Sequence, residues 1–129
     1  MKDPSKWVSK KKSMWVGKNG DPKYSTKKHK KERAARGFSD YDWWGFDSYL
    51  TFVILGGLKK FRKDANGYPG ELESEEWNDI LDQMILGFET RQKITDGKFG
   101  WEGKKYEAAV LIREQGTALF IRWYDQLWD

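Results

Sequence analysis

The stretch SEEWNDILDQMILGF, from Ser74 to Phe88, carries the clearest structural signal in the chain and decides the fold class. Its apolar residues recur at the spacing of one face of an α-helix, namely Trp77, Ile80, Leu81, Met84, Ile85 and Phe88. Ser74 is a favourable N-cap, and the two glutamates after it suit the positive end of the helix dipole. The pattern predicts an amphipathic helix that begins at Ser74 and continues to about Ile94.

A second helix is predicted upstream, over about residues 39–65. Ser39 is its N-cap candidate, and Asp42, three residues later, can complete a capping box. Apolar residues cover most of the circumference of this helix, so we expect it to be the central, buried helix of the fold. Gly56 and Gly57 lower its helix propensity, and we expect that they allow a neighbouring helix to approach closely.

A third helix is predicted downstream, from about Tyr106 to Trp128. Its apolar residues also form a stripe, and the segments between the helices contain the turn-forming pairs Asn-Gly and Pro-Gly. Three helices with apolar stripes predict an all-α fold. We expect a three-helix bundle, or a four-element bundle if a helix from the N-terminal region packs on it.

The charge of the chain is divided unevenly. Residues 1–36 contain 13 Lys and Arg against 3 Asp and Glu, a balance of +10, whereas residues 37–129 contain 11 against 17, a balance of −6. No periodicity runs through the first part of the basic region, but good helix formers follow Ser25. We therefore predict a basic, largely irregular arm over residues 1–36, with a short helix near 26–35, and a helical bundle domain over residues 37–129.

Cations of the arm occur in clusters that are interleaved with aromatic residues. Lysine and arginine bind phosphates and release counterions, and aromatic rings stack on unpaired bases. The arm is therefore predicted to bind nucleic acid through Lys10, Lys11, Lys12, Trp15, Lys18, Lys27, Lys28, Lys30, Lys31, Arg33 and Arg36. Two other interpretations stay open, a solvated tail and an arm that folds back on the acidic body.

Asp47 and Arg113 are charged residues at apolar positions of their predicted helices. Asp47 follows Trp43 by four residues and precedes Leu50 by three, so it lies within an apolar stripe. A buried carboxylate needs a partner or becomes protonated. We predict that Asp47 meets Arg113, or a tryptophan N–H, inside the bundle and fixes the register of the helices. A ligand site at Asp47 is the alternative.

Catalytic, metal and cofactor chemistry is not indicated. Glu76, Asp79 and Asp82 recur at three-residue spacing, but they lie opposite the apolar stripe, and ligands of a metal site must converge. The single histidine, His29, lies among lysines, and cysteine is absent. We predict a protein with no catalytic residues, no bound metal and no cofactor. A small carboxylate–metal hydrolase is the alternative.

Targeting signals are also missing from the sequence. The longest apolar run, over residues 49–58, is shorter than the roughly 20 residues that span a bilayer. The basic N-terminus lacks the apolar segment of a secretory signal peptide. We expect no membrane partner and no secretion by a signal peptide.

Four blocks of the sequence resemble a set of small, uncharacterised proteins of tailed bacteriophages. The blocks are RGFSDYDWWGFDSYL, then GYP, then EEWNDILDQMI with GFE, and finally LFIRWYDQLWD. The resemblance covers roughly residues 36–128, with a gap across 95–105, and does not cover the first 35 residues. It implies a viral protein with a small accessory role, in the host-cell cytoplasm or in the virion. It implies no activity.

Two functions follow as hypotheses. The first is a non-enzymatic bacteriophage accessory protein whose basic arm binds nucleic acid while the acidic helical body acts as a scaffold. The second is a protein-interaction module that binds or inhibits a host factor or a phage-assembly component, through exposed aromatic residues such as Trp44, Phe52 or Trp128. The surplus of aromatic residues also makes a homodimer an open alternative to a monomer.

Overall fold

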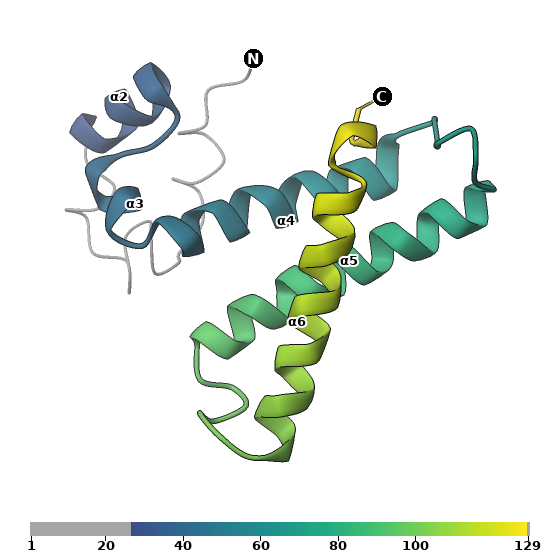
Figure 1. Ribbon diagram of the computed structural model, residues 1–129. Helices are drawn as coiled ribbons and strands as arrows, with labels where there is room; N and C mark the ends of the chain where they lie inside the picture. The colour runs from purple at the N-terminus through teal and green to yellow at the C-terminus, as the bar shows by residue number, and fades with distance from the viewer. Residues whose placement is uncertain (1–26, 129) are drawn as a thin grey trace. The chain divides into compact units, whose positions relative to one another are not determined.

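We describe the protein from a computed structural model, in which residues 27–128 are defined (Figure 1). Every element in this range is helical, and no strand occurs between residues 27 and 128. The predicted all-α class is therefore confirmed. The elements are α2 (Lys27–Arg36), α3 (Asp40–Trp44), α4 (Phe46–Asp64), α5 (Ser74–Thr95), α6 (Lys104–Arg122) and the short 3₁₀-helix η3 (Tyr124–Gln126).

The chain divides into two compact units, and the border between them falls inside α4, between Leu50 and Thr51. Among the described residues, the first unit contains α2, α3 and the start of α4, and the second contains the rest of α4, α5, α6 and η3. The border predicted at residue 36 does not coincide with this division. The helix α2 lies where a short helix was predicted, but a buried ion pair joins it to α3.

The helix predicted over residues 39–65 is interrupted. Its first turn is α3, and Gly45, with φ −119° and ψ 55°, separates it from α4. The Gly45 carbonyl accepts the Tyr49 N–H at 3.0 Å, so a new helix begins there. Glycine lowers the cost of such a break because it has little helix propensity to lose.

The two other predicted helices differ from the observed ones mainly at their ends. The N-cap of α5 is Glu73 rather than Ser74, and the Glu76 carboxylate accepts the Glu73 N–H at 2.9 Å. The last long helix, α6, ends at Arg122, and the chain then tightens into η3 before Trp128.

The core of the second unit is built by α4, α5 and the end of α6. Trp77 lies at its centre, 2% exposed, and packs edge-to-face on Trp123 with the ring centroids 5.7 Å apart. Such aromatic pairs add to the free energy of burial. The predicted stripe of α5 therefore faces the core. The buried members of the cluster are Leu55, Leu58, Trp77, Leu81, Met84, Phe88 and Trp123.

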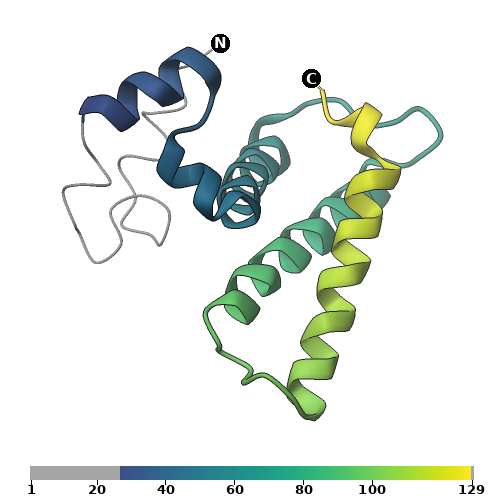
Figure 2. The same cartoon turned by 60° about the vertical axis from the view of Figure 1, so that its left-hand side comes forward.

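Close contact between helices occurs at Gly87 of α5 and Gly116 of α6, where these helices lie side by side (Figures 1 and 2). A Cβ atom on Gly87 would lie 2.6 Å from the Gly116 Cα atom. Only glycine fits there. The close approach predicted at Gly56 and Gly57 is wrong, because a Cβ atom on either would have no neighbour within 4 Å among the described residues.

Candidate nucleic-acid interface

The helix α2 is attached to α3 by a buried ion pair between Arg33 and Asp42. Arg33 Nε donates to Asp42 Oδ2 at 2.7 Å, and Arg33 Nη2 donates to Asp42 Oδ1 at 3.0 Å. Both side chains are 0% exposed. Two parallel hydrogen bonds fix the orientation of the two planar groups as well as their separation. The pair therefore sets the position of α2 relative to α3.

Asp42 has a second role at the start of α3. Its carboxylate accepts the Ser39 N–H at 2.8 Å, and its own N–H donates to Ser39 Oγ at 3.0 Å. This is the capping box predicted from the sequence, and the structure confirms it. One carboxylate thus starts α3 and holds α2.

Tyr49 of α4 connects this helix to the end of α2 in the same unit. Its hydroxyl donates to the carbonyl of Gly37, the residue that ends α2 with a φ of 90°. Burial, together with the nearby Asp42 carboxylate, raises the pKa of Tyr49 to about 12. The hydroxyl therefore stays protonated, and remains a donor, throughout the neutral range.

A second, exposed cluster lies on one side of α2. The Arg36 guanidinium donates to Asp40 at 2.7 Å and to Glu32 at 3.2 Å, and lies 4.5 Å from the centroid of the Phe38 ring. The hydrogen bond from Arg36 holds the pKa of Asp40 below its usual range. Lys28 lies 3.9 Å from the same carboxylate. Acids and bases nearly balance on this side of the helix.

The lysine face of α2, which we define as Lys27, Lys30 and Lys31, differs from that cluster. These residues are spaced i, i+3 and i+4, so they share one side of the helix, and all three are exposed. Within residues 27–128, the structure gives none of them a carboxylate partner. No carboxylate of the described residues therefore compensates their charge.

Two tryptophans in the same unit are turned toward solvent. Trp43 is 65% exposed and Trp44 is 84% exposed, which is unusual for such large apolar rings. The helix over residues 39–65 was expected to be buried, and this expectation is wrong for Trp43, because α3 is one short turn that buries Ser39 and Asp42 instead. Since the Arg33–Asp42 pair joins α2 to α3, the tryptophans and the lysine face belong to one compact unit.

The structure changes the set of predicted nucleic-acid contacts. Arg33 is 0% exposed, so its assignment to the interface is wrong. Arg36 forms ion pairs with Glu32 and Asp40 of the same chain. Its neighbours Lys27, Lys28, Lys30 and Lys31 are exposed. The remaining predicted contacts, Lys10, Lys11, Lys12, Trp15 and Lys18, lie outside the described residues.

The burial predicted for Asp47, as part of a pair with Arg113, is wrong. Asp47 is exposed, in the first unit, and Arg113 Nη2 in the second unit donates to the adjacent Glu114 at 2.7 Å. The buried pair that the fold does use was missed because Arg33 lies in a run of charged residues. One signal was available. The only apolar residues of α2 are two alanines, so docking α2 required burial of a polar side chain.

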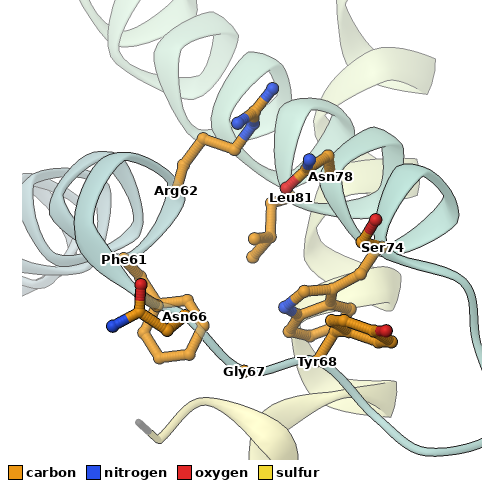
Figure 3. Close-up of a pocket in the computed structure, with 10 residues that line it drawn as sticks. Phe61, Arg62, Asn66, Gly67, Tyr68, Ser74, Asn78 and Leu81 are labelled. Carbon is orange, nitrogen blue, oxygen red and sulfur yellow. The ribbon is translucent and has the colours of Figure 1, made fainter.

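The second unit contains a small hollow of ≈ 130 Å³ where the end of α4 meets the start of α5 (Figure 3). Its lining includes Phe61, Trp77 and Leu81, with polar groups around them. The Arg62 and Asn66 side chains point in different directions (Figure 3), and Arg62 donates to Asp82 at 2.9 Å. The polar groups do not converge on a common point, and we assign no ligand to this hollow.

Two of the three acidic residues singled out in α5 have structural partners. Glu76 caps its own helix, Asp82 binds Arg62, and Asp79 is exposed. Over residues 27–128, His, Asp and Glu side chains form no group of three that could hold a metal ion. In the same range, no helix is both long enough and apolar enough to cross a membrane.

Comparisons with protein-family models, with curated proteins and with solved structures found no match to this chain.

Proposed function

We propose that the first unit binds single-stranded nucleic acid, with the lysine face on the phosphates and Trp43 and Trp44 on the bases. The observation that carries the proposal is the buried Arg33–Asp42 pair, because it holds exposed cations and exposed rings together in one compact unit. Cationic grooves supply affinity for the backbone, and each stacked base contributes about 1–3 kcal/mol. The rest of the predicted basic arm, residues 1–26, would add further phosphate contacts.

The biological role we propose is that of a non-enzymatic bacteriophage accessory protein. The resemblance of the four sequence blocks to small phage proteins supports a viral source. The acidic second unit, with its aromatic core, would then act as the scaffold. A protein-interaction module remains the second candidate, because an 84%-exposed tryptophan would also fit a protein partner.

Replacement of both exposed tryptophans tests the stacking part of this proposal. The double substitution Trp43→Ala and Trp44→Ala is expected to lower the affinity for a labelled single-stranded oligonucleotide by about 30-fold or more, because each of the two rings stacks on one base and contributes at least about 1 kcal/mol. The affinity for a duplex of the same sequence should change much less. Fluorescence anisotropy measures both.

The matched control is Trp101→Ala, because Trp101 is 69% exposed in the second unit. It should leave both affinities unchanged. Equal decreases for the control and the double substitution would contradict the stacking role. If the full chain binds no oligonucleotide but retains a partner from nuclease-treated host lysate through Trp44, the protein-interaction module is the better description.

A further inference from the structure

The helix α6 covers the core with one face and leaves the opposite face open. Ala109 and Gly116 are buried. In contrast, Leu111 is 64% exposed and Ile121 is 69% exposed, although both are large apolar side chains. Ala108, Ala118 and the intervening Glu114 and Gln115 are exposed on the same side of the helix. Arg113 of the same chain pairs with Glu114 at 2.7 Å, so the charge of Glu114 is already balanced there. We call this side the open face of α6.

Charged residues at the two ends of the open face occur in a particular order. Lys104 and Glu107 are exposed near the start of α6, and Arg122 and Asp125 are exposed at and just after its end. At each end of the open face, a basic residue precedes an acidic one. Two copies of the face therefore place opposite charges next to each other only when the two helices run antiparallel.

Antiparallel alignment of two copies of the open face satisfies that order. Lys104 of each copy then faces Asp125 of the other, and Glu107 faces Arg122. Between these ends, Leu111 of each copy faces the small Ala118 of the other. Parallel alignment would instead place like charges opposite one another, which is unfavourable.

We propose that the open face of α6 binds the open face of a second copy of this chain, giving an antiparallel dimer with two-fold symmetry. An isologous contact of this kind requires that residue i meets residue j and that j meets i. The charge order of α6 provides such reciprocal pairs. The proposal does not depend on nucleic-acid binding.

Sedimentation velocity of the full chain, from micromolar to high micromolar concentration, tests the dimer. The wild-type chain should sediment as a dimer at the upper concentrations. Leu111→Glu is expected to raise the dissociation constant at least about tenfold, because it places a charge where Leu111 of one copy packs on Ala118 of the other. The matched control is Leu86→Glu on α5, where Leu86 is 49% exposed but lies outside the open face, and it should sediment as wild type.

Charge reversal tests the antiparallel geometry. Glu107→Lys alone and Arg122→Glu alone should each weaken self-association, since each places like charges opposite one another across the two-fold axis. A mixture of the two variants should restore the dimer, because every such pair across the interface is then opposite in charge. Circular dichroism checks that each variant is folded.

Three results would overturn the proposal. They are a monomeric wild-type chain at every concentration, equal effects of the Leu111 and Leu86 substitutions, and a charge-reversal mixture that associates no better than either variant alone.

Discussion

Asp42→Asn is expected to unfold the first unit while the second unit stays folded. The substitution removes the negative charge from a pair in which both side chains are 0% exposed, and Arg33 is left as a buried cation without a counter-charge. Breaking such a pair costs about 3–5 kcal/mol. The amide oxygen of asparagine can still accept the Ser39 N–H, so the change acts mainly on the ion pair rather than on the cap.

Hydrogen exchange followed by mass spectrometry separates the two units. Peptides from residues 27–50 of the Asp42→Asn variant should lose protection, and peptides from α5 and α6 should keep it. The control is Asp40→Asn, two residues earlier on α3, because the Asp40 side chain is 60% exposed and exposed ion pairs contribute about 0–1 kcal/mol. The pair has no anchoring role if the two variants exchange alike.

Gly87→Ala is expected to have the largest effect on the second unit. The new methyl group would lie 2.6 Å from the Gly116 Cα atom, which is backbone and cannot rotate away. The helices α5 and α6 would have to separate, and overpacking of this kind costs about 1–3 kcal/mol or more. Urea unfolding followed by tryptophan fluorescence should show a lower midpoint.

Gly56→Ala is the matched control in the same unit. It adds the same methyl group to a helix, but with no neighbour within 4 Å among the described residues. Because alanine has the higher helix propensity, we expect stabilisation of up to about 1 kcal/mol. A Gly87→Ala variant that is as stable as wild type would contradict the observed packing of α5 on α6.

Local features of the fold could be predicted from the sequence, because their signals lie within one or two helical turns. The capping box needs only Ser39 and a carboxylate three residues later. The stripe of α5 needs only a repeat of apolar residues. Both predictions are confirmed by the structure.

Contacts between distant residues could not be predicted in the same way. Arg33 and Asp42 look like surface charges, because neither is part of an apolar pattern, and only the packing of α2 on α3 buries them. The pairing of Gly87 with Gly116 depends on where two helices cross. The adjacent glycines Gly56 and Gly57 also suggested a close approach of helices, but a Cβ atom on either has no neighbour within 4 Å among the described residues.

The candidate interface was predicted in part. The charge balance of the arm indicated the lysines of α2, but it could not distinguish the exposed lysine face from Arg33, which is buried, and Arg36, which is bound to Glu32 and Asp40. The helical period assigned Trp43 to a buried face. It is exposed because α3 stops after one turn and Gly45 starts a new helix.

The salt dependence of oligonucleotide binding tests the central claim most directly. Replacing Lys27, Lys30 and Lys31 with glutamine should weaken binding and make the slope of log K against log salt concentration shallower by about 0.7 for each phosphate that is no longer neutralised, or about 2 in all. The control replaces Lys63, Lys93 and Lys98 of the second unit, which are also exposed, and changes the net charge equally. The claim predicts a shallower slope for the lysine-face variant alone, and equal slopes for the two variants would contradict it.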